Sequence, residues 1–342
     1  MKSTQTQVFL ARAHLRSIAV RPAVQVAALL WTIANLAVLL LADGFLPFDR
    51  PALAALPFVQ QVAFPTLGLI EVFLLMAVVF LLTRRRELPD IAERAPARAL
   101  AAKEAALLLC YAGVGQIGGW IVGPALGYRP FSFHIAGTLV GCSTPPRIGE
   151  VWTWAIYNFV IFAVLPYPWF RRRYSATQLN LRSSNRRNDI LVIVVVALIE
   201  GAVELSQFPG ILQMSARQLL WAAPLSFIVF MIGTVLPTMV LIYSILVPRY
   251  LKLTGSFTNT VLLGGLTYAA MHLVEGWSVF NNPRDIALSL IFVGLQYFGP
   301  GMIKTFITLR TGNAWVHALG YHAFAPHVLV DAPLIAKVFG IR

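Results

Sequence analysis

Long apolar runs without charged residues constrain this chain more than any other feature. The 21 residues between Arg21 and Asp43 carry no charge. An α-helix rises 1.5 Å per residue, so about 20 residues cross the roughly 30 Å hydrocarbon core of a bilayer. The run is longer than the apolar region of a secretory signal peptide. It therefore predicts a retained first transmembrane helix over residues 23–42.

Eight further apolar runs follow the first one. The whole chain is 58% hydrophobic and 12% charged, whereas a soluble domain is about a quarter charged. We therefore expect an all-α, polytopic transmembrane bundle. Nine spans are predicted, and eight are the alternative because several runs are short. The further runs cover residues 63–83, 105–127, 151–170, 190–205, 219–247, 260–274, 286–303 and 313–330.

Positive charge is unevenly distributed between the loops. Lys and Arg total 27 against 14 Asp and Glu. Most lie in the N-terminal segment and in alternate loops, including residues 84–103 and 171–187. Cytoplasmic loops are rich in Lys and Arg, so the N-terminus is predicted to lie in the cytoplasm. We expect an integral protein of the plasma (inner) membrane, whose basic loops contact anionic lipid. Nucleic acid is not an expected partner, since the basic residues lack interleaved aromatic residues.

The basic and polar stretch from Arg171 to Asp189 is the best internal boundary. It divides the chain into an N-terminal membrane part of about four helices, residues 1–174, and a C-terminal part of about five helices, residues 175–342. The two cysteines, Cys110 and Cys142, have no spacing that indicates a disulfide framework or a zinc knuckle. Redox chemistry by cysteine is therefore not indicated.

Ionisable residues cluster in or beside the C-terminal spans. They are the histidines and carboxylates His272, His317, His322, His327, Glu200, Glu204 and Glu275. Because burying such groups in hydrocarbon costs a few kcal/mol or more, they are functional candidates by default. We favour His272 and His322 for function. Glu200 and Glu204 also fit a packing role, and Glu275 either pairs with His272 one turn away or ends its span at the water interface.

Helix geometry separates the last three histidines. They are five residues apart, so in a regular α-helix they point about 140° from one another. They cannot all line one site unless the helix is broken. Pro326 removes the hydrogen bond to the His322 carbonyl and favours a kink there. In depth, Glu200, His272 and His322 lie about 15, 18 and 14 Å from the starts of their spans. One carboxylate and two imidazoles in one layer can hold a metal or activate a water.

Three short segments resemble motifs of a known family. They are LTYAAMH at 266–272, LRTGNAW at 309–315 followed by His322, and QLNLR at 178–182. Their order and spacing resemble the CAAX-protease and related (CPBP/Abi) intramembrane protease family over residues 175–334. The resemblance implies a helical membrane bundle in which a glutamate activates a water, while two histidines and an asparagine complete the site. Tyr268 then stands for the family's aromatic residue, and His272 and His322 stand for its two histidines.

The resemblance also implies a hydrophobic or prenylated peptide, or a membrane protein, as substrate. Whether a divalent metal takes part stays open, with His272, His322 and Glu275 as candidate ligands. Two departures matter. The family's asparagine falls on Pro326, and its Glu-Glu pair falls near Thr238 and Met239, neither of which is a carboxylate.

Loss of the Glu-Glu pair leaves two possibilities. Another carboxylate, Glu200 or Glu275, acts as the base, which gives the predicted catalytic set Glu200, His272 and His322. Otherwise the chain is an inactive family member that serves as a membrane binding or regulatory protein.

Two other classes of function were weighed. A metal or haem oxidoreductase would use His272, His317, His322 and His327, but the five-residue spacing argues against several of them reaching one centre. Transport is the remaining alternative, although two related halves with matching broken helices are not evident in the sequence.

Overall fold

The structure, a computed structural model, describes residues 20–135 and 144–342, and its secondary structure in these ranges is helical, without strands. Cys142 lies outside the described residues. The simple helices are α2 (Pro22–Leu41), α3 (Pro51–Ala54), α4 (Phe58–Thr83), α5 (Arg98–Ala125), α8 (Arg186–Gln207), α12 (Phe257–Ala270) and α13 (Pro283–Thr311).

Three longer stretches are helices interrupted by wider, π-helical turns. The first joins α6 (Ile148–Asn158) to α7 (Pro166–Arg171), and the second runs from α9 (Ala216–Phe230) through α10 (Leu236–Thr238) to α11 (Val247–Thr254). The third joins α14 (Ala314–His317) to α15 (Ala332–Val338). Such turns are rare in proteins and are frequent at functional sites.

Six helices in the described part of the chain are long and apolar enough to cross a membrane. They are α2, α4, α5, the α6–α7 stretch, the α9–α11 stretch and α13. The prediction of a helical membrane bundle is confirmed at this level. The other three predicted spans coincide with α8, α12 and the α14–α15 stretch, so their status as spans stays a prediction.

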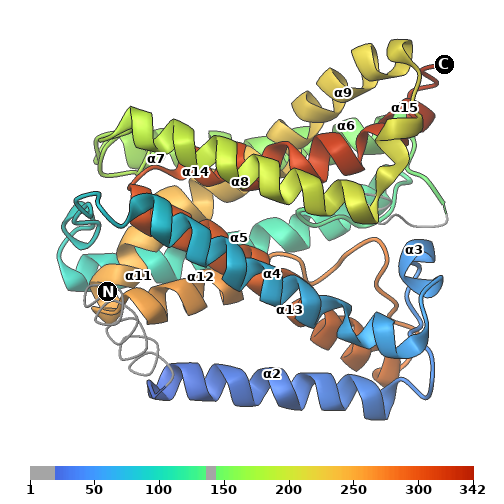
Figure 1. Ribbon diagram of the computed structural model, residues 1–342, viewed down its shortest axis with the longest axis horizontal. Helices are drawn as coiled ribbons and strands as arrows, with labels where there is room; N and C mark the ends of the chain where they lie inside the picture. Colours follow the sequence, from blue (N-terminus) through green and yellow to red (C-terminus); the bar gives the residue numbers. More distant parts are fainter. Residues whose placement is uncertain (1–19, 136–143) are drawn as a thin grey trace, which may run out of the picture.

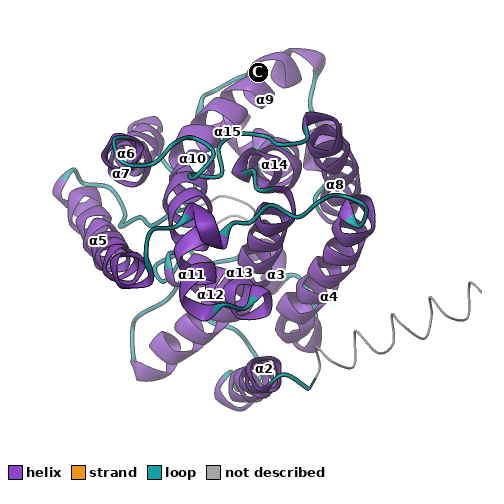
Figure 2. Ribbon diagram, turned by 90° about the vertical axis from the view of Figure 1, so that its left-hand side faces the viewer, coloured by secondary structure: helices purple, strands orange, loops and turns teal. Residues whose placement is uncertain are grey.

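The helices form one bundle around α13. In Figures 1 and 2, α13 runs through the middle of the molecule, beside α12, with α2, α4, α5 and α8 farther out. One large cluster of buried apolar side chains extends from Val38 in α2 to Ala323 in the last helical stretch. Many large apolar side chains of α2, α4 and α5 are exposed on the outside, for example Leu40, Leu74 and Ile121. Such an outer surface suits contact with lipid chains.

The family-like segments at 178–182 and 309–315 meet at one end of the bundle. Gly312 has a positive φ of 65° and ends α13, and the Asn313 side chain then caps α14. A glycine is favoured there because other residues rarely adopt a positive φ. The backbone carbonyl of Asn180 accepts a hydrogen bond from the Ala314 amide at 2.7 Å. Arg94 donates to both the Asn180 side chain and the Gly312 carbonyl, at 2.6 and 2.7 Å.

The basic loops lie together at this same end. Arg86 pairs with the buried Asp189 and donates to the Thr311 carbonyl at 2.6 Å. Arg98 donates to the Leu253 carbonyl at 3.0 Å, and Lys252 pairs with Glu93 at 2.7 Å. The loop after α4, the start of α8 and the ends of α11 and α13 therefore share one end of the molecule (Figure 1).

A buried ion pair joins the N-terminal and C-terminal parts. Arg249 of α11 is fully buried and donates two hydrogen bonds to Glu104 Oε2 of α5, at 2.9 and 2.7 Å. The Tyr174 hydroxyl donates to Glu104 Oε1 at 2.7 Å. Burial and the neighbouring Glu104 raise the pKa of Tyr174, so its hydroxyl keeps the donated proton. The guanidinium also packs over the rings of Phe170 and Tyr174.

We predict that Glu104→Ala lowers the free energy of unfolding by about 3–5 kcal/mol, because it leaves a buried guanidinium without its counter-charge. Unfolding of the purified protein in mixed micelles measures the change. The matched control is Glu93→Ala, which removes the exposed pair with Lys252 and should change stability by less than about 1 kcal/mol. Equal effects of the two substitutions would contradict a structural role for the Glu104–Arg249 pair.

Candidate functional site

The break in the last helical stretch brings two histidines to the same place. Residues 318–323 and 325–330 are π-helical, and Phe324 lies between them. In a π-helix each amide bonds five residues back, so residues five apart lie nearly above one another. The imidazole rings of His322 and His327 are therefore neighbours, with centroids 5.2 Å apart. The predicted break near Pro326 is present, and the angular objection drawn from a regular α-helix does not apply.

His272 and Glu275 lie in a buried turn after α12. The predicted span over 260–274 is too long, since α12 ends at Ala270 and a turn follows. His272 is fully buried, and its Nδ1 lies 2.5 Å from the Tyr268 carbonyl. A carbonyl only accepts hydrogen bonds, so Nδ1 carries the proton and Nε2 is an acceptor. Glu275 is 4% exposed, so it does not end a span at the water interface.

Sequence reasoning missed His134, which lies in the loop after α5. This loop enters the bundle and is held there by Ser132. The Ser132 hydroxyl donates to the Met271 carbonyl, and the Ser132 carbonyl accepts hydrogen bonds from Trp154 and Asn158 at 3.1 and 2.8 Å. The only signal in the sequence was a pair of polar residues inside apolar runs, Gln116 and Asn158. Both are buried and contribute to anchoring the loop.

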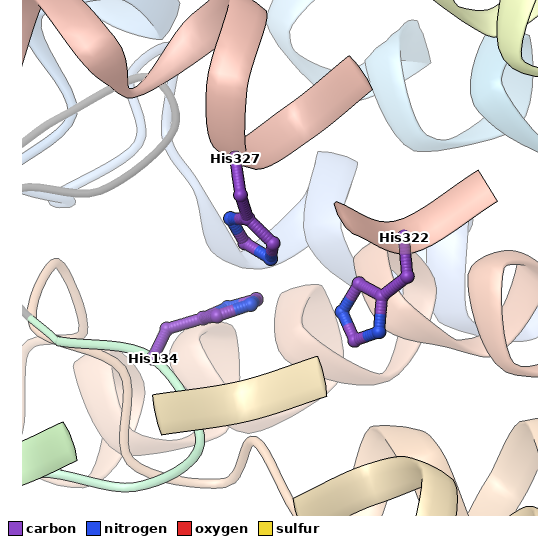
Figure 3. Close-up of side chains that lie close together, drawn as sticks. All are labelled: His134, His322 and His327. Carbon is purple, nitrogen blue, oxygen red and sulfur yellow. The ribbon is translucent and has the colours of Figure 1, made fainter. Parts of the chain in front are cut away.

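Four histidines and one carboxylate meet in the centre of the bundle. They form two groups that share His134: His134 with His322 and His327, and His134 with His272 and Glu275. Within each group one possible ligand atom from each residue lies within 4.8 Å of the others. Figure 3 shows the rings of His134, His322 and His327 turned toward a common space. All five residues are buried.

Several polar atoms of this cluster have no hydrogen-bond partner within residues 20–135 and 144–342. They are Nε2 of His134, His272 and His327, and Oε1 of Glu275. Buried polar atoms are normally satisfied, since leaving one unpaired costs about 1–3 kcal/mol. Four such atoms in one cluster indicate that water or an ion belongs there.

Tyr268 connects the two predicted histidines. Its hydroxyl lies 3.3 Å from His322 Nε2, and its ring centroid lies 4.4 Å from that of His272. Lys304 Nζ lies 3.7 Å from the centre of the same ring. Both His272 and His322 thus lie next to Tyr268.

Glycines allow this tyrosine to lie between α12 and α13. A Cβ atom added at Gly301 would come within 2.6 Å of the Tyr268 Cβ and 2.8 Å of the Gly265 Cα. Gly264 also lies close to α13, since a Cβ added there would meet Thr305 at 1.9 Å.

The other predicted site residues lie elsewhere. Glu200 is buried in α8 near Glu71, Glu204 and Lys304, and it belongs to neither histidine group in the described ranges. His317 packs on Tyr243, with ring centroids 4.1 Å apart. Thr238, at the place of the family's missing Glu-Glu pair, has its hydroxyl 3.5 Å from His322 Nδ1.

Comparisons with known proteins give no match: no family model, no curated protein and no solved structure matches the chain. The family resemblance therefore remains a prediction that rests on the motif residues.

We predict that Gly301→Ala destabilises the bundle by about 1–3 kcal/mol, since the backbone of α12 must move to accept the new methyl group. The matched control is Gly294→Ala on the same helix, where an added Cβ meets nothing within 4 Å. It should be neutral or stabilise by up to about 1 kcal/mol. Thermal unfolding in detergent compares the two variants, and equal midpoints would contradict the tight packing at Tyr268.

Proposed function

We propose that the protein is an intramembrane peptidase of the CAAX-protease-like type with a rearranged Glu/His site. The observation that carries this proposal is the meeting of His272, His322 and Glu275 around Tyr268 in the buried centre of the bundle. These are the two histidines of the family resemblance, together with a carboxylate from a different position.

Glu275 takes the place of the missing Glu-Glu pair as the general base. Its Oε1 and His272 Nε2 both lack hydrogen-bond partners among the described residues, and one ligand atom of each residue in this group lies within 4.8 Å of the others. One water, with two hydrogen bonds of about 2.8 Å, spans such a separation. Because His272 Nδ1 is bound to a carbonyl, His272 Nε2 is free to accept a proton, as the Glu275 carboxylate is. They are therefore suited to draw a proton from this water as it attacks a peptide carbonyl.

The opposite side of the cluster supplies the hydrogen-bond donor that stabilises the developing negative charge on the substrate oxygen. The Tyr268 hydroxyl and His322 Nε2 lie 3.3 Å apart. Donors placed where negative charge develops lower the barrier to acyl transfer. In this mechanism the Tyr268 hydroxyl stabilises the oxyanion and His322 positions that hydroxyl, a task that the family assigns in part to the asparagine absent here. Thr238, which lies where the family has a carboxylate, supports His322 from the other side.

The proposed topology has nine spans, with eight as the alternative, and a cytoplasmic N-terminus in the plasma (inner) membrane. Contacts among the basic loops support it, because Arg86, Arg94 and Arg98 bind residues at the ends of other helices on one side of the bundle. An excess of Lys and Arg on one side is typical of cytoplasmic loops. The proposed substrate is a hydrophobic or prenylated peptide, or a membrane protein, which reaches the site from the lipid.

A second proposal is favoured by the complete burial of the site. His272 is fully buried and His322 is 2% exposed, as expected if the cluster serves only stability. In that case the protein is an inactive relative that binds a hydrophobic peptide or regulates another membrane protein.

The peptidase proposal predicts which carboxylate is needed. Glu275→Gln should lower the rate of peptide cleavage by about 10²–10⁴-fold, the usual loss on removing a general base. His272→Ala and His322→Ala should cause losses of similar size, while Glu200→Gln should keep most of the rate. The assay uses purified protein in liposomes with a quenched fluorescent peptide that ends in a farnesylated cysteine and three further residues. A quenched transmembrane peptide serves as a second reporter.

His317→Ala is the matched control, since His317 is a buried histidine of the same helical stretch outside the cluster. Cleavage by this variant should resemble that of the wild type. If the wild type cleaves neither reporter but binds the farnesylated peptide, and His272→Ala still binds it, the inactive alternative replaces the peptidase. If Glu200→Gln rather than Glu275→Gln abolishes cleavage, the assignment of the base is wrong.

A further inference from the structure

We propose that His134, His322 and His327 bind a divalent transition-metal ion, of which zinc fits the ligand set best. This site joins a residue of the N-terminal part of the chain to two residues of the last helical stretch. It includes two histidines, His134 and His327, that have no place in the family resemblance. The proposal does not depend on peptidase activity, since three imidazoles bind a metal equally well in an inactive protein.

The Nδ1 atoms of His327 and His134 have polar partners. His327 Nδ1 lies 3.0 Å from Asp331 Oδ2, and Asp331 is fully buried. His134 Nδ1 lies 3.3 Å from the Tyr297 hydroxyl and 3.7 Å from Glu275 Oε2. Histidines that bind metals almost always donate their second ring nitrogen to a carboxylate, carbonyl or water, which fixes the tautomer and strengthens the ligand. His327 has a carboxylate in that position, and His134 has the Tyr297 hydroxyl, with the Glu275 carboxylate just beyond hydrogen-bond distance.

His322 completes the pattern with neutral partners. Its Nδ1 lies 3.5 Å from the Thr238 hydroxyl, and its Nε2 is the nitrogen that a metal bound here would take over from the Tyr268 hydroxyl. This Nε2 lies 3.3 Å from the Tyr268 hydroxyl. A metal bound to His322 therefore has Tyr268 close by.

The nitrogens that remain are suited to hold an ion. Nε2 of His134 and of His327 is buried and has no hydrogen-bond partner in the part of the chain that the structure describes. The ligand atoms of the three residues lie within 4.8 Å of one another. Zinc bound to imidazole nitrogens at 2.0–2.1 Å in a tetrahedral site needs nitrogens about 3.4 Å apart. Binding therefore requires the three rings to move closer together than they lie here.

The donor set selects the kind of metal. Imidazole binds zinc, copper, iron, cobalt and nickel, whereas magnesium and calcium require oxygen ligands. Three histidines leave a fourth position for water in a tetrahedral zinc site, and zinc lowers the pKa of such a water to about 7. The structure thus assigns to this cluster a metal with an open coordination position.

Metal binding by the purified full chain tests the assignment. The protein is stripped with a chelator and titrated in detergent with zinc or cobalt alone, and the bound metal is counted by mass spectrometry. The wild type should bind about one ion, and bound cobalt should show the visible absorption of tetrahedral coordination. His134→Ala, His322→Ala and His327→Ala should each abolish stoichiometric binding. Asp331→Asn should weaken it about 10–100-fold, the usual loss for a residue that orients a ligand.

His317→Ala is the matched control, because it removes a buried imidazole from the same stretch but outside the cluster. It should bind metal as the wild type does. Where an alanine variant does not fold, Asp331→Asn, which keeps the size of the side chain, decides the question. The proposal is overturned if the wild type binds no ion, if His317→Ala loses as much binding as His327→Ala, or if Asp331→Asn binds as tightly as the wild type. Failure of the peptidase assay alone leaves metal binding in place.

Discussion

The structure around the site depends on one constraint: polar groups buried in an apolar bundle need partners from within the bundle. Such groups are costly to leave unpaired because neither lipid nor aliphatic packing offers hydrogen bonds. Most of this chain obeys the rule. Arg249 is satisfied by Glu104, Arg310 by Thr83, and Asn158 by two backbone carbonyls. The histidine cluster departs from it, with four atoms that lack partners among the described residues. Unpartnered atoms also occur elsewhere in these ranges, for example both ring nitrogens of His317. The cluster differs because it gathers four of them from three separate segments, which indicates an occupant.

The buried ion pairs and the buried histidine cluster have different roles in the structure. The ion pairs of Glu104 with Arg249 and of Asp189 with Arg86 lie toward the end where the basic loops gather, and they link helices that are distant in the sequence. The cluster lies away from that end, where the loop with Ser132 and His134 enters the bundle and the turn with His272 and Glu275 follows α12. The linked helices thus provide a rigid frame, and irregular backbone within the frame carries the polar cluster. This arrangement is expected in membrane proteins, where non-helical backbone is tolerated only inside the protein or beside a polar cavity.

The sequence predicted the helices well and the site only partly. Apolar run length located each predicted span on a helix, because the bilayer imposes that length. His272 and His322 were identified because ionisable residues are rare in such runs. His134 was missed because it lies in a loop, and loop paths depend on tertiary contacts such as those of Ser132. His327 was set aside because a period of 3.6 residues was assumed, whereas the chain near Pro326 is π-helical. Glu200 was favoured by depth alone, and depth does not determine which way a helix face points.

The π-helical break also bears on the choice between a hydrolase and a metal-containing oxidoreductase. The five-residue spacing of the histidines argued against a metal-containing oxidoreductase because such residues diverge in a regular α-helix. In the π-helical stretch, however, the rings of His322 and His327 are neighbours. The ligand set still argues against di-iron chemistry, which uses several carboxylates in direct contact with the metals. Here Asp331 and Glu275 face the Nδ1 atoms of histidines, which is the position of orienting groups. Three imidazoles beside a carboxylate and a histidine with free acceptor atoms suit activation of water more than electron transfer. The hydrolysis that we propose would use more of the cluster than redox chemistry would, because it gives a role to Glu275 Oε1 and His272 Nε2 as well as to the three imidazoles.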